Sequence, residues 1–191
     1  LHMIPPANDK RNFPESFIRR LTARGISVLN LYRRGAGASE GTAADAYLGP
    51  KGKDDVRGAT GLLRAHVCAF DATRIGIVAA SNGTTSAVDY AVFASAAGSV
   101  PKPKALVFMS AGEYTEAQNK LADHRSEFDP VPILFTYPPS ERAWNARVKA
   151  TASANWVFKE FSKGDHGTKL FLADPSASDY ISEFIDKALK K

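Results

Sequence analysis

The chain contains, near its middle, the sequence Arg74-Ile75-Gly76-Ile77-Val78-Ala79-Ala80-Ser81-Asn82-Gly83, and an alanine-rich segment follows it through Ala97. The apolar run has the length of a buried strand, and alanine favours helix. The residues two before and two after the serine are small, which lets the backbone turn sharply without a clash. The sequence therefore predicts a strand, an abrupt turn and a helix, with the Ser81 hydroxyl exposed at the end of the strand.

Similar short apolar runs recur along the chain and alternate with segments of helical spacing. Strands that alternate with helices indicate parallel crossovers, and therefore an α/β fold whose mostly parallel sheet is flanked by helices on both faces. A length of 191 residues suits one domain over residues 1–191, and the sequence has no repeat or linker that would divide it. The expected strands are 26–31, 74–80, 105–109, 133–137 and 156–161, and the expected helices are 14–25, 54–66, 83–97 and 180–189.

Composition excludes several classes of protein. Hydrophobic residues make up 44% of the chain and charged residues 24%, values typical of globular proteins, and no segment is apolar enough to suggest a membrane span. The net charge of +5 comes from scattered Lys and Arg without a basic run, so we expect no nucleic-acid partner. The single cysteine, Cys68, cannot form an internal disulfide and is interpreted as a small buried residue. The sequence leaves oligomeric state open, and localisation too, with a slight preference for the cytoplasm.

Ser81 has two interpretations. In a strand–turn–helix elbow its Oγ is a candidate nucleophile, and the Asn82 backbone N–H at the helix start points to where an oxyanion would form. Alternatively, Ser81 only caps the following helix, as many serines do.

A nucleophilic hydroxyl needs a base and an acid that orients it. His166 lies in Gly164-Asp165-His166-Gly167-Thr168, a loop directly after the last expected strand. By itself such a loop histidine is more often a solvated side chain. The acid should follow an intervening strand, as Glu141 follows 133–137. Glu113, which follows 105–109, is the alternative acid.

The chain resembles α/β-hydrolases of the dienelactone-hydrolase and serine-esterase kind. Four pieces carry the resemblance, in family order and over nearly the whole chain: His2-Met3-Ile4-Pro5, Arg34-Gly35-Ala36-Gly37-Ala38-Ser39, the Ser81 elbow and Asp165-His166-Gly167-Thr168. The sequence departs from the family at three positions. Ala79 and Met3 stand where glycines are usual, and Tyr32 replaces an aspartate before the second piece.

The resemblance implies a serine hydrolase that cleaves carboxylic esters of small substrates through an acyl-enzyme, without a metal or organic cofactor. It implies the chain order nucleophile, acid, base, which favours His166 as the base. It also implies that the backbone N–H of Ile4 or Met3 completes the oxyanion hole with that of Asn82. A peptidase or amidase on the same triad is one alternative, and a non-catalytic protein that binds a ligand or partner is another.

The resemblance also predicts that the first strands of the fold are missing. In the family a strand precedes His2 and lies between the strands that here end near Leu31 and Ala80. Only Leu1 remains of it, and each backbone group left unpaired in the core would cost about 1–3 kcal/mol. We therefore expect an N-terminally truncated fragment.

Overall fold

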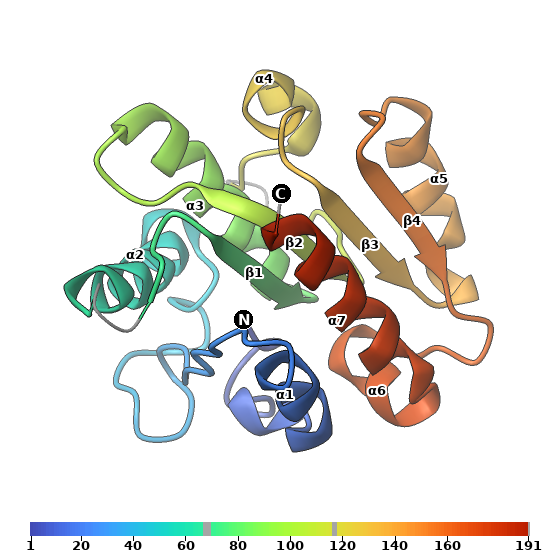
Figure 1. Cartoon of the computed structure of the whole chain (residues 1–191), viewed down its shortest axis with the longest axis horizontal. Helices are drawn as coiled ribbons and strands as arrows, with labels where there is room; N and C mark the ends of the chain where they lie inside the picture. Colours follow the sequence, from blue (N-terminus) through green and yellow to red (C-terminus); the bar gives the residue numbers. More distant parts are fainter. Residues whose placement is uncertain (67–69, 116–117, 191) are drawn as a thin grey trace.

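The computed structural model describes residues 1–66, 70–115 and 118–190, so Cys68 lies outside the described residues. Its centre is a sheet of four parallel strands in the order β1-β2-β3-β4 (Figure 1). Neighbouring strands are in close register: Met109 lies opposite Ala80 on one side and opposite Thr136 on the other. The α/β fold and four of the five expected strands are confirmed. The strands are β1 (Ile75–Ala80), β2 (Pro103–Met109), β3 (Ile133–Tyr137) and β4 (Trp156–Glu160).

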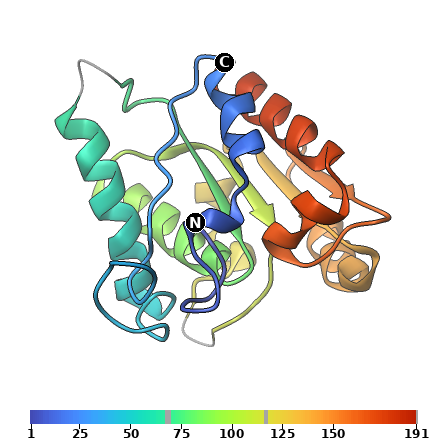
Figure 2. The same ribbon diagram turned by 90° about the horizontal axis from the view of Figure 1, so that it is seen from below.

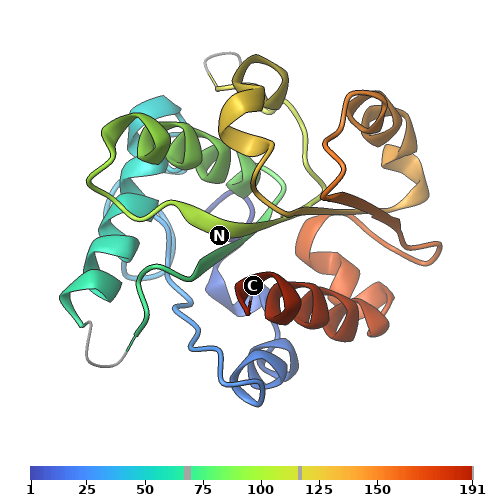
Figure 3. The ribbon, with the colours of Figure 1, turned by 45° about the horizontal axis from the view of Figure 1, so that its top comes forward.

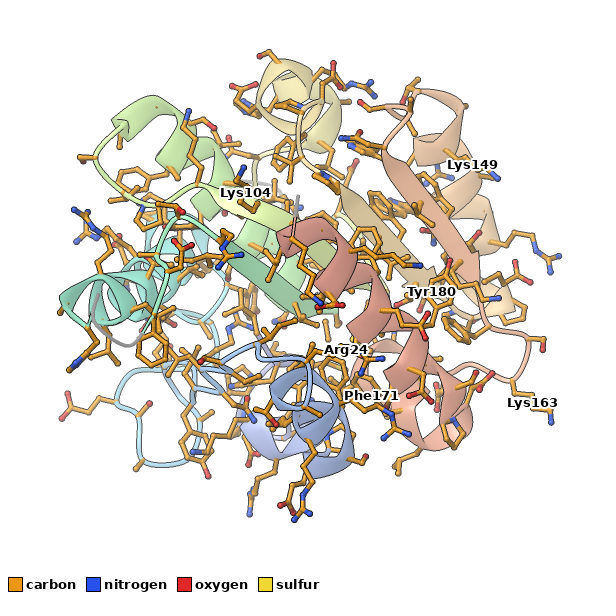
Figure 4. All side chains as sticks on the ribbon, in the orientation of Figure 1. Arg24, Lys104, Lys149, Lys163, Phe171 and Tyr180 are labelled. Carbon is orange, nitrogen blue, oxygen red and sulfur yellow. The ribbon has the colours of Figure 1, made fainter. Side chains whose placement is uncertain are left out.

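Helices cover both faces of this sheet (Figure 3). Helices α3, α4 and α5 lie on one face, where α2 packs against α3 and a core forms around Phe108 and Phe135. Helices α1, α6 and α7 cover the other face over a second core, and Figure 4 shows Phe171 and Tyr180 on this side. Lys104, Lys149 and Lys163 are exposed on separate parts of the surface (Figure 4). The helices are α1 (Glu15–Thr22), α2 (Gly49–Ala65), α3 (Gly83–Ala97), α4 (Arg125–Phe128), α5 (Arg142–Ala150), α6 (Leu170–Ala173) and α7 (Ser176–Leu189), with 3-10 turns η1 (Lys10–Asn12), η2 (Leu121–His124), η3 (Pro139–Glu141) and η4 (Gly167–Lys169).

The prediction of a strand at 26–31 is wrong. This segment is irregular chain that lies at the surface beside β1 (Figure 2), and a cavity of about 580 Å³ separates the two. A strand needs a hydrogen-bonded neighbour, and the backbone of residues 27–31 makes no hydrogen bond to any described residue. The apolar run therefore lines a cavity in place of joining the sheet.

Leu1 occupies one end of this cavity. Its amino group donates to the Val78 carbonyl, and Ala80 N donates to the Leu1 carbonyl over 3.0 Å. This is the hydrogen-bond pattern of a parallel strand pair, one residue long. Burial, together with the charge of Arg33, lowers the pKa of the Leu1 amino group to about 5. Within the part of the chain that the structure describes, the outer edge of β1 is thus paired only at its carboxyl end. Among the described helices, none is long and apolar enough to cross a bilayer.

Candidate active site

Ser81 lies in the tight turn between β1 and α3. Its φ of 51° is left-handed, a conformation that is costly for a residue with a side chain and is found mainly at functional sites. The turn is fixed by hydrogen bonds from Ser81 N to Met109 O (2.8 Å) and from Thr84 N to Ser81 O (2.9 Å). Helix α3 has Asn82 at its N-cap and no side-chain capping hydrogen bond. The Ser81 hydroxyl is bonded instead to a histidine.

His166 contacts both Ser81 and Glu141. Its Nε2 lies 2.7 Å from Ser81 Oγ, and its Nδ1 lies 2.7 Å from Glu141 Oε1. Because an ionised carboxylate only accepts, Nδ1–H donates to Glu141, which leaves Nε2 to accept the Ser81 hydroxyl proton. The imidazole is therefore held in the tautomer that a general base requires.

The two other carboxylates near this site are placed differently. Glu113 has a half-exposed side chain whose carboxylate lies 3.6 Å from Lys120 Nζ. Asp165 accepts a hydrogen bond from the backbone N–H of His166, at 2.6 Å. Neither carboxylate makes a hydrogen bond to the His166 ring. Glu141 reaches the ring because η3 returns the chain toward the site directly after β3.

Ser110, which the sequence did not indicate, fixes the histidine loop. It follows β2 as Ser81 follows β1, and it also has a left-handed φ, of 55°. Its Oγ accepts a hydrogen bond from Gly167 N at 2.8 Å, next to His166. The Tyr114 hydroxyl donates to the Ser110 carbonyl, and the Tyr114 ring meets the His166 ring edge to face at 6.4 Å. Burial raises the pKa of Tyr114 to about 12, so this phenol stays protonated.

The N-terminal segment lies against the elbow and the histidine loop. A Cβ on Gly83 would come within 2.6 Å of Leu1 O and 2.8 Å of His2 O, so this residue must be glycine for the segment to approach α3. On the other side, a Cβ on Gly167 would meet Met3 Sδ at 2.5 Å. Both contacts place Met3 between the loops that carry Ser81 and His166.

The backbone N–H groups of Asn82, Met3 and Ile4 have no hydrogen-bond partner among the described residues. Met3 is buried, whereas Ile4 is 41% exposed. His2 stabilises this segment from behind: its Nδ1–H donates to Met3 O at 2.7 Å, and its Nε2 accepts from Arg33 N at 3.0 Å. Burial lowers the pKa of His2 to about 4, so the ring is neutral and both bonds persist at neutral pH.

Arg33 is a further residue that the sequence did not indicate. Its side chain is fully buried, although the adjacent Arg34 reaches the surface and pairs with Asp55 at 2.7 Å. The two adjacent arginines therefore lie in opposite environments, and the sequence does not indicate which of them is buried.

The chain is similar in fold to solved esterase structures. One structure of the esterase Est22 matches with a TM-score of 0.64 and 17% identity, over 92% of this chain and 66% of Est22. A second Est22 structure matches with a TM-score of 0.63 and 16% identity, over 92% and 65%. The chain thus spans just under two thirds of the length of Est22. No protein-family model matches the chain, and no curated protein sequence does.

Proposed function

We propose that the protein is a serine hydrolase that cleaves carboxylic esters of small substrates, with Ser81, His166 and Glu141 as its catalytic triad. The observation that carries this proposal is the pair of 2.7 Å contacts that His166 makes with Ser81 Oγ and Glu141 Oε1. The left-handed backbone of Ser81 and the fold shared with an esterase support it.

In the proposed reaction, Ser81 Oγ attacks the ester carbonyl carbon while its proton passes to His166 Nε2. Glu141 accepts the Nδ1–H bond throughout and stabilises the imidazolium that forms. The carbonyl oxygen becomes an oxyanion, which the Asn82 N–H and a second N–H, from Met3 or Ile4, stabilise. The alcohol leaves with the proton from His166. Water, activated by the same histidine, then hydrolyses the acyl-enzyme and restores Ser81.

Ser81→Ala tests the nucleophile. The variant should lose p-nitrophenyl acetate hydrolysis by several orders of magnitude and should not react with a fluorophosphonate probe. Ser126→Ala, which removes an exposed hydroxyl on α4, is the matched control and should behave as the wild type. Wild-type activity in Ser81→Ala would refute the mechanism. Folded wild-type protein that neither turns over esters nor reacts with the probe would favour a non-catalytic binding protein, and faster cleavage of a p-nitroanilide would favour an amidase.

A further inference from the structure

The guanidinium of Arg33 lies behind the proposed oxyanion hole. Its Nη1 donates to His2 O at 2.9 Å and to Asn82 Oδ1 at 3.3 Å. Its Nη2 donates to Ser86 Oγ at 2.9 Å and to the Ala46 carbonyl. Within the described residues, no carboxylate lies at ion-pair distance from Arg33; the Asp55 carboxylate, which is paired with Arg34, raises the pKa of Arg33 only from a longer distance. Arg33 is therefore a fully buried cation that neutral oxygens alone solvate.

The two bonds from Nη1 join the two segments that carry the free backbone amides. The peptide group between His2 and Met3 is planar and trans, so its N–H points away from its C=O. When Arg33 holds the His2 carbonyl, it fixes the direction of the Met3 N–H and polarises it. The same nitrogen also holds the Asn82 side chain, next to the second free amide.

The same geometry favours the Met3 N–H over the Ile4 N–H as the second donor of the proposed oxyanion hole. The peptide group that contains the Ile4 N–H is held through Met3 O by neutral His2, and Ile4 is 41% exposed. The Met3 N–H belongs to a buried residue and lies on the peptide group that the cation holds. A buried donor in low dielectric stabilises a developing anion more than an exposed one does.

A buried arginine without a counter-ion is costly, and such charges are rarely retained unless they are paired. Burial lowers the pKa of Arg33 to about 10, so its charge persists at neutral pH. The anion that forms on the substrate during acyl transfer would be a counter-ion present only in the transition state. A fixed charge used in this way accelerates the chemical step without tightening substrate binding.

We propose that Arg33 is a positioning residue of the oxyanion hole, which holds the Met3 and Asn82 backbone N–H groups together, and that Met3 supplies the second donor. This inference rests on the proposed esterase function. Arg33 acts through the His2 carbonyl and the Asn82 side chain, and it does not touch the substrate.

The test compares Arg33→Met with Arg34→Met, which removes the same charge from the next position but contacts neither amide-bearing segment. Loss of an oxyanion-hole donor lowers kcat by about 10²–10³-fold, and Arg33→Met should approach this loss with little change in KM. Its affinity for a short alkylboronic acid, which forms an anionic tetrahedral adduct on serine, should fall in parallel. Arg34→Met should keep the wild-type kcat and the wild-type affinity for the boronic acid. Wild-type kcat and boronate affinity in Arg33→Met would overturn the proposal.

Arg33→Lys provides a second measurement in case Arg33→Met does not fold. A lysine keeps the charge but cannot make four bonds in a planar fork, so part of the lost kcat should return. In ¹H–¹⁵N spectra the Met3 and Asn82 amide signals should shift in Arg33→Lys and stay in place in Arg34→Met. Unshifted Met3 and Asn82 signals would refute the positioning role even if the wild type hydrolyses no ester. Failure of the esterase proposal is detected separately, by a wild type that does not react with the fluorophosphonate probe.

Discussion

Gly83 and Gly58 both lie in helices, but replacing each by alanine should change the stability of the protein in opposite directions. Replacing a helical glycine by alanine normally stabilises a protein by about 1 kcal/mol, because alanine loses less backbone entropy on folding. Gly58, in the middle of α2, has open space around its Cβ position and should follow this rule. At Gly83 the new methyl group would lie 2.6 Å from Leu1 O and 2.8 Å from His2 O.

Both of these neighbours are backbone atoms, which cannot rotate away as a side chain can. The oxygens must retreat by several tenths of an ångström, and overpacking of this kind costs about 1–3 kcal/mol. After the gain in helix propensity is subtracted, Gly83→Ala should still be destabilised, by up to about 2 kcal/mol. The retreat also displaces the His2 carbonyl that Arg33 holds. Since a misplacement of about 1 Å can cost 100-fold in rate, we expect kcat to fall about tenfold.

Urea denaturation and ester hydrolysis measure the two effects on the same samples. Gly58→Ala should unfold at higher urea concentration than the wild type and keep its kcat. Gly83→Ala should unfold at lower concentration and lose activity. If Gly83→Ala were stabilised as much as Gly58→Ala and equally active, the N-terminal segment would not lie against α3 as described.

Three other predictions concern the groups around the triad. Glu141→Gln should lower kcat by about 10³–10⁴-fold because the His166 tautomer is no longer fixed. Glu113→Gln should leave kcat unchanged. An equal loss of kcat in the two variants would exclude Glu141 as the acid. Ser110→Ala leaves the Gly167 N–H without its acceptor, so the free energy of unfolding should fall by about 1–3 kcal/mol and kcat should fall with it; urea denaturation and kinetics that match the wild type would contradict this role. Burial gives His2 a pKa of about 4 in the folded protein against 6.5 in the unfolded chain, so the unfolded state takes up its proton first as the pH falls. The contribution of neutral His2 to the free energy of unfolding is fully present above pH 6.5 and is lost toward pH 4, a decrease of up to about 3 kcal/mol. In urea titrations across this pH range, His2→Asn should not show this decrease.

Much of the fold could be predicted because its signals are local. Residues 74–83 specify a strand, a turn and a helix within ten positions, and each later strand is a compact apolar run of its own. The segment 26–31 is also largely apolar but forms no strand. Pairing depends on a neighbour elsewhere in the chain, and no local pattern reports whether that neighbour is present.

The candidate site is predictable from sequence to the extent that it depends on chain order. Ser81, Glu141 and His166 each follow an expected strand, and parallel strands bring their carboxyl ends to one edge. The choice between Glu141 and Glu113 depends on where η3 directs the chain after β3, which residue spacing alone does not determine. Arg33 and Ser110 had no signal of their own, because their roles arise from contacts with residues distant in sequence.

The outer edge of β1, which pairs only with Leu1 among the described residues, also has a consequence for how the protein behaves at high concentration. An edge strand with free backbone groups is a template for β-pairing between molecules, and proteins usually block such edges with charges, bulges or a covering segment. Along Ile75–Val78 the side chains are apolar or absent and none of the four residues is exposed, because segment 26–31 lies on the other side of the facing cavity and covers this edge. Conditions that detach segment 26–31 should therefore expose β1 to pairing between molecules, and loss of the protein from solution under those conditions should depend on protein concentration.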